Sequence, residues 1–195
     1  MRRARSLSVV GMLLAGAIGV ISSTQTWIDV TLADGAQQTL AVPGSDAVPV
    51  LTPLSLAALA LGAALSIVGP VLRYVLGAIA LAIAAAVGVA TALVLLTLPV
   101  SATAATVTEA TGISGADAVA DLVASMSLTP WPAVTLLAEL ILAAAALFTL
   151  VTARNWLGSA GRKYRTAADA PADASRPHDA IDSWDDLSRG DDPTA

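Results

Sequence analysis

The sequence contains no cysteine, a single histidine and only 13% charged residues. Without cysteine, disulfides, thiolate zinc sites, iron–sulfur clusters and cysteine nucleophiles are excluded. The histidine, His178, follows Pro177 in a polar tail, where we expect a solvated side chain rather than a metal ligand or a general base. Soluble domains typically carry about 25% charged residues. Because 56% of this 195-residue chain is hydrophobic, we expect lipid to be its solvent.

Motifs that carry chemistry are also missing. The sequence has no phosphate loop, no Gly-x-Ser-x-Gly, no paired carboxylates at inward-facing positions and no metal-ligand spacing. It has no basic stripe with interleaved aromatic residues, so we expect no nucleic-acid binding. We predict a protein that is not an enzyme and that binds no cofactor or metal.

Two long polar segments, 28–50 and 99–130, contain no lysine or arginine. The basic residues lie before the first apolar run, in a short break between the second and third, and after the fourth: Arg2, Arg3, Arg5, Arg73, Arg154, Arg162, Lys163, Arg165, Arg176 and Arg189. Cytoplasmic loops of membrane proteins carry an excess of lysine and arginine. The pattern predicts an all-α plasma-membrane protein with four transmembrane helices and with both termini in the cytoplasm.

Four apolar segments have the roughly 20 residues that a helix needs to cross a bilayer: 7–26, 51–72, 74–98 and 131–151. The first follows three arginines, as a signal peptide does, but no Ala-x-Ala cleavage site follows it, so we expect a retained span. Gly69, Pro70 and Arg73 predict a tight cytoplasmic turn at residue 73. The other parts are a cytoplasmic N-terminus at 1–6, outer loops at 27–50 and 99–130, and a cytoplasmic tail at 152–195.

Both outer loops are predicted to contain secondary structure. In the first, residues 28–32 and 38–42 alternate in character around Asp34-Gly35, a strong turn signal, which predicts a β-hairpin. In the second, apolar residues at helical spacing predict a short amphipathic surface helix over about residues 115–127.

Small residues recur at four-residue spacing in three of the spans. They are Gly11, Ala15 and Gly19 in the first, Ala58, Gly62 and Ser66 in the second, and Ala78, Ala82, Ala86 and Ala90 in the third. Such faces let helix backbones approach closely in lipid, where packing drives association. We expect them to form the contacts of the bundle itself; a homo-oligomer face is the alternative.

One ionisable residue, Glu139, lies inside a predicted span. It is about 10 Å from the outer end of the last helix at about 1.5 Å per residue, and no lysine or arginine lies at a similar depth. Because an intramembrane carboxylate is costly, we expect Glu139 to be protonated or to face a wet crevice. Ser22, Thr91 and Thr135 fall at comparable depths, which predicts a polar layer in the outer half of the bundle. The alternative is a purely structural role, in which Glu139 hydrogen-bonds a neighbouring hydroxyl or carbonyl.

The tail from residue 166 is rich in Ala, Asp, Pro and Ser, a composition typical of disorder. Near its end, a short helix over about residues 180–189 would place Trp184 and Leu187 on one side, beside Arg189. A tryptophan and a leucine kept in an acidic tail are typical of a docking peptide. The alternative is that one exposed aromatic residue has no role.

Three segments carry a resemblance to a known family. They are Ser22-Ser23-Thr24-Gln25-Thr26-Trp27 at the exit of the first span, Thr52-Pro53-Leu54 at the start of the second, and the tail from Trp184 to Thr194. In these segments the chain resembles the Trp biosynthesis-associated membrane proteins of actinobacteria, small four-helix proteins whose genes lie among those of tryptophan synthesis. The resemblance implies a context in tryptophan biosynthesis, and it implies no catalytic residues.

Two functions are consistent with these features. The first is a membrane anchor, scaffold or regulator whose tail docks a cytoplasmic protein of tryptophan biosynthesis. The second is transport of tryptophan or a related aromatic compound, by the bundle or an oligomer of it, with Glu139 and the nearby hydroxyls along the path. A four-span chain is small for a transporter and shows no broken helix or inverted repeat, features expected of secondary transporters. This favours the scaffold.

Overall fold

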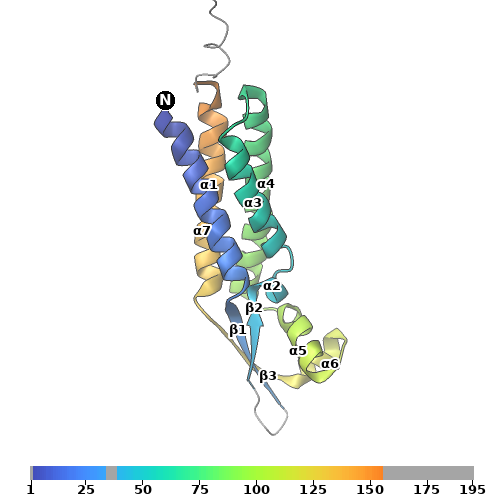
Figure 1. Ribbon diagram of the computed structural model, residues 1–195. Helices are drawn as coiled ribbons and strands as arrows, with labels where there is room; N and C mark the ends of the chain where they lie inside the picture. Colours follow the sequence, from blue (N-terminus) through green and yellow to red (C-terminus); the bar gives the residue numbers. More distant parts are fainter. Residues whose placement is uncertain (1, 34–38, 156–195) are drawn as a thin grey trace, which may run out of the picture. The chain divides into compact units, whose positions relative to one another are not determined.

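Four helices packed side by side form the main part of the computed structural model, which describes residues 2–33 and 39–155 (Figure 1). They are α1 (Arg2–Ser23), α3 (Leu51–Leu65), α4 (Pro70–Thr97) and α7 (Trp131–Thr152). Helix α7 packs against both α1 and α4, and α3 packs against α1. Within the described residues, α1, α4 and α7 are long and apolar enough to cross a membrane, whereas α3 has 15 residues.

The connection between α3 and α4 differs from the prediction. Helix α3 ends at Leu65 rather than residue 72, and backbone hydrogen bonds continue one more turn to Val68. Pro70 then begins α4, because proline needs no amide partner in the first turn and forces Gly69 before it into an extended conformation. The predicted turn at residue 73 is therefore wrong: Arg73 lies in the first turn of α4, and its side chain is only 2% exposed.

A three-stranded antiparallel sheet follows the end of α1. Strand β1 (Thr26–Leu32) pairs with β2 (Thr39–Pro43), with Val30 opposite Leu40, which confirms the predicted hairpin strands. The predicted turn at Asp34-Gly35 lies outside the described residues. Strand β1 is central, and its side chains Ile28 and Val30 are fully buried.

The second edge of β1 is covered by a strand that the sequence analysis missed. The predicted helix over 115–127 ends at Leu122 as α6 (Ala116–Leu122), and the chain continues as β3 (Val123–Leu128). Strand β3 pairs with β1, with Leu128 opposite Ile28 and Met126 opposite Val30. The prediction was wrong over its second half because pairing with β1 satisfies the backbone of both strands, a tertiary effect that outweighs local helical spacing.

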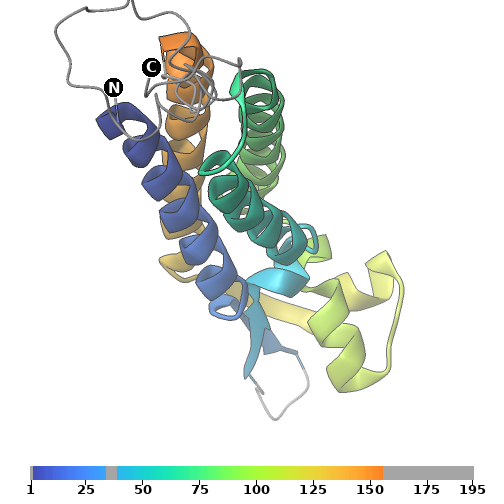
Figure 2. The ribbon, with the colours of Figure 1, turned by 45° about the horizontal axis from the view of Figure 1, so that its top comes forward.

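Short helices lie beside this sheet at the same end of the bundle (Figures 1 and 2). They are α2 (Gly44–Ala47), the 3-10 helix η1 (Val100–Thr103) and α5 (Ala104–Thr111), with α6; a second 3-10 turn, η2 (Ala153–Asn155), follows α7. The hydroxyl of Thr106 donates to the carboxylate of Asp46 at 2.8 Å. This bond ties α5 to α2.

Small residues set the close approach of the helices, but only partly as predicted. A Cβ added at Gly16 would lie 2.9 Å from the backbone nitrogen of Leu59, so α1 and α3 nearly touch there. In α4, by contrast, three residues of the predicted stripe, Ala78, Ala82 and Ala86, are exposed, and the fourth, Ala90, is half-buried. The face of α4 that is buried instead includes Gly77, Ala80, Ala84, Val87 and Thr91. The four-residue spacing was present on both faces of this alanine-rich helix, so it did not identify the packed one.

Candidate functional site

A series of hydrogen bonds joins the end of α1 to the start of α7, next to the sheet. The hydroxyl oxygens of Ser22 and Thr135 lie 2.6 Å apart, and the indole Nε1 of Trp27 donates to Ser22 Oγ at 3.0 Å. Thr135 Oγ1 donates to the carbonyl of Trp131 at 3.1 Å. Each hydroxyl has one proton, so only one direction satisfies every bond: Trp27 to Ser22, Ser22 to Thr135, and Thr135 to Trp131. Trp27, Ser22 and Thr135 are all fully buried.

Glu139 lies one turn further along α7 on the same buried face, with its side chain 4% exposed. A Cβ added at Gly88 of α4 would lie 3.8 Å from Glu139 Cβ, so the glycine leaves room beside the carboxyl group. Thr91, one turn after Gly88, is 0% exposed. Glu139 Oε2 and Thr91 Oγ1 are both buried without a hydrogen-bond partner among the described residues. Such groups carry an uncompensated desolvation cost.

Glu139 also lines a groove between α4 and α7. Its volume is about 260 Å³, and its lining is apolar apart from Glu139: Leu81, Ala84, Ala85, Gly88, Val89, Leu136, Glu139, Leu140 and Ala143. The groove is open on one side rather than enclosed. Of the four predicted residues, Ser22 and Thr135 are thus bonded to each other. Thr91 and Glu139 instead each have a buried polar atom without a partner among the described residues.

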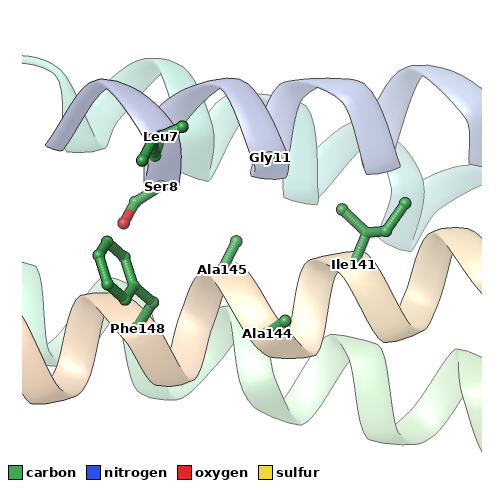
Figure 3. Close-up of a pocket in the computed structure, with 7 residues that line it drawn as sticks. All are labelled: Leu7, Ser8, Gly11, Ile141, Ala144, Ala145 and Phe148. Carbon is green, nitrogen blue, oxygen red and sulfur yellow. The ribbon is translucent and has the colours of Figure 1, made fainter. Parts of the chain in front are cut away.

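A second groove, of about 410 Å³, runs between α1 and α7 (Figure 3). Its lining is apolar apart from Ser8, whose side chain points into the space between the two helices. Ser8 is 1% exposed and its hydroxyl has no hydrogen-bond partner in the described part of the chain. The groove contains no charged group, so it suits an apolar chain better than a polar ligand.

Sequence reasoning missed Ser8 and Ser55, whose buried hydroxyls have no hydrogen-bond partner among the described residues. Ser55 of α3 is 2% exposed and faces Gly19 of α1. The signal for Ser55 was present, since a glycine on one helix often receives a small polar side chain from the next. Within residues 2–33 and 39–155, no three metal-ligating side chains lie together. The candidate docking residues Trp184, Leu187 and Arg189 lie outside the described residues.

Apolar helices of membrane-spanning length, packed through glycines and with hydroxyls bonded between them, define a helical integral membrane protein. Residues 9–194 match the family of tryptophan-associated transmembrane proteins, and the chain belongs to that family. This confirms the resemblance found in the sequence. No curated protein and no solved structure matched the chain.

Proposed function

We propose that the chain crosses the plasma membrane four times, with both termini in the cytoplasm. Charge supports this topology. Among residues whose side chains the structure describes, the basic ones are Arg5, Arg73 and Arg154, all at the end of the bundle where α1 begins (Figure 1). Asp29, Asp46, Glu109, Asp117 and Asp121 lie in the strands and short helices of the opposite end. The positive-inside rule assigns the arginine end to the cytoplasm.

The geometry of α3 supports a fourth crossing. Helix α4 begins at the same end of the bundle as α1, so the chain must return from the sheet through α3 (Figure 1). Fifteen residues of helix rise about 22 Å, and the extra turn to Val68 brings this to about 27 Å. A bilayer core of about 30 Å is nearly matched by this length.

We propose that this bundle is a non-catalytic membrane scaffold or regulator linked to tryptophan biosynthesis. The observation that carries the proposal is the bond between Ser22 and Thr135, which holds α1 to α7 while the buried Trp27 of β1 donates to Ser22. Helices α4 and α7 are continuous over 28 and 22 residues. The grooves at the arginine end and beside Glu139 open at the surface of the bundle. Tightly packed continuous helices suit an anchor rather than a carrier that alternates between two states.

The cytoplasmic tail is the proposed docking element. The test is a pull-down of cytoplasmic tryptophan-biosynthesis proteins with the full-length protein and with a Trp184→Ala, Leu187→Ala double variant. We expect the double variant to lose the partner while the protein still inserts in the membrane. A matched variant, Pro171→Ala and Pro177→Ala, changes the same tail outside the proposed helix and should retain it. Equal capture by all three proteins would contradict the docking proposal.

Transport is the second candidate, and Glu139 is the observation that favours it. In the described part of the chain, a buried carboxyl oxygen of Glu139 has no partner, and Glu139 lines a groove beside Gly88, where it could bond a ligand. The test is uptake and efflux of labelled tryptophan in cells lacking the gene, complemented with the intact protein, Glu139→Gln, or a form truncated after Thr166. Flux restored by the intact and truncated forms but not by Glu139→Gln would favour transport over the scaffold. Unchanged flux in every strain would remove transport of tryptophan.

A further inference from the structure

A notch at the arginine end of the bundle arises because α3 is short. Gly19 of α1 faces Ser55 of α3, and Gly62 of α3 faces Met12 of α1, so the two helices are antiparallel. Extending this register places Leu65, the last residue of α3, opposite about Val9. The first turns of α1 therefore continue past the end of α3.

The lining of the notch combines one charged residue with apolar side chains. It has a volume of about 470 Å³ and is lined by Arg5, Ser6, Val9, Val10 and Ser66. Val10 is 59% exposed, and Ile67 next to Ser66 is 84% exposed, so apolar surface surrounds it. Ser66 donates its one hydroxyl proton to the carbonyl of Ala63 at 2.6 Å, so it has no proton left for a ligand. The charged residue of the lining is Arg5, whose guanidinium is a hydrogen-bond donor.

Positive potential at this end is reinforced by a second arginine. Arg5 lies close enough to the buried Arg73 for the two charges to act on each other. Within the described helices α1, α3, α4 and α7, the one carboxylate is Glu139, in the half of α7 that is far from the arginine end. The Arg5 guanidinium beside the apolar side chains of Val9 and Val10 favours an anionic group with an apolar chain attached.

We propose that the notch between α1 and α3 binds an anionic phospholipid, with its phosphate on Arg5 and an acyl chain along Val9 and Val10. The groove of Figure 3 provides the contrast, because its apolar lining contains no cation and has no basis for selecting a headgroup. Basic pockets between transmembrane helices are typical sites of anionic lipids. This site depends only on membrane insertion, so it holds whether the protein is a scaffold or a transporter.

The test measures lipid retained by the purified full-length protein. The protein is reconstituted with equal amounts of phosphatidylglycerol and phosphatidylcholine, re-extracted in detergent, and analysed by native mass spectrometry. We expect phosphatidylglycerol to be retained preferentially. Arg5→Gln should lower its retention about fivefold, the effect of one basic residue at an anionic surface. Arg154→Gln removes the same charge from the same end of the bundle outside the notch, where Arg154 is exposed, and should change nothing.

Ser66→Leu fills the notch without a change of charge and should also lower retention of phosphatidylglycerol. Because Ser66 is exposed, this variant is expected to fold, which gel filtration and thermal unfolding verify. Equal loss in Arg5→Gln and Arg154→Gln would show general surface charge and overturn the proposal. So would an absence of preference between the two lipids, unchanged retention in Ser66→Leu, or displacement of the lipid by excess inorganic phosphate.

Discussion

Ser22 and Thr135 lie 113 residues apart in sequence, yet their hydroxyl oxygens are 2.6 Å apart between α1 and α7. The bond sits between two tryptophans, since Trp27 donates to Ser22 and Thr135 donates to the carbonyl of Trp131. Hydrogen bonds in such a series polarise one another. This arrangement fixes the first helix against the last where both meet the sheet.

Removing the hydroxyl of Ser22 or of Thr135 should destabilise the bundle, and the two costs should not be additive. Thr135→Val keeps the shape and removes the hydroxyl, which should cost about 0.6 kcal/mol and no more than about 1.7 kcal/mol, the average and the maximum for hydrogen bonds between membrane helices. Ser22→Ala should cost a similar amount, because Trp27 keeps a bond to the Ser22 carbonyl at 3.1 Å. The double variant should cost less than the sum of the two, measured by unfolding in micelles.

The control for this cycle is Thr97→Val in α4. Thr97 is exposed, and its hydroxyl donates only within its own helix, to the carbonyl of Leu93 at 2.7 Å. Its loss should be nearly neutral. Strictly additive costs for Ser22→Ala and Thr135→Val would show that the two hydroxyls do not stabilise each other.

Glycine contacts between α1 and α3 give a second prediction. Gly16→Ala places a Cβ 2.9 Å from the backbone nitrogen of Leu59 and 3.0 Å from the carbonyl of Ser55, and neither backbone atom can move independently. The helices must separate, which should cost about 1 to 3 kcal/mol. Gly88→Ala is the matched control, because its Cβ would have an ordinary 3.8 Å contact with Glu139. Equal thermal stability of the two variants would contradict this packing.

The sequence predicted those features that depend on local composition. Apolar length indicated the long helices, and alternation indicated the strands of β1 and β2. The end of α3 was missed because the apolar run continues beyond Leu65 to Leu72. The boundary between α3 and α4 depends instead on Gly69, which Pro70 forces into an extended conformation. Strand β3 was missed because its partner, β1, lies almost 100 residues earlier.

The candidate site was likewise predicted only in part. Depth along each helix placed Ser22, Thr91, Thr135 and Glu139 in one half of the bundle, and the structure buries all four. Depth does not specify rotation about the helix axis, so sequence alone gave no reason for Ser22 to bond Thr135 while Glu139 faces Gly88. Which face of a helix is packed depends on its neighbours, as the exposed Ala78 and Ala82 also show.

Glu139 provides a test that separates structure from function. If the carboxyl group has no bonding role in the fold, Glu139→Met removes an unsatisfied buried oxygen, which should raise the free energy of unfolding by about 1 to 3 kcal/mol. Glu139→Gln keeps a polar group and should change stability less. A loss of stability in Glu139→Met would instead indicate that the carboxyl group bonds a partner in the bundle. That result would favour the purely structural role.

The absence of cysteine from the chain permits a direct test of the four crossings. Single cysteines are introduced at Ser114, an exposed residue between α5 and α6, and at Ile67, which is 84% exposed between α3 and α4. With four spans, a membrane-impermeant maleimide should label Ser114→Cys in intact cells. Ile67→Cys should react only after the cells are permeabilised.

The reverse pattern distinguishes a three-span chain. If α3 stayed on the outer surface, α4 would carry the chain inward, so the loop containing Ser114 would lie in the cytoplasm and Ile67 would face the outside. Labelling of Ile67→Cys but not of Ser114→Cys in intact cells would therefore refute the fourth crossing. An added Arg154→Cys variant should match Ile67→Cys in the four-span topology, because both positions lie at the arginine end of the bundle (Figure 1). In the three-span topology α7 would carry the chain outward again, so Ile67→Cys and Arg154→Cys would both react in intact cells. Reaction of both positions only after permeabilisation is therefore the outcome that requires four spans.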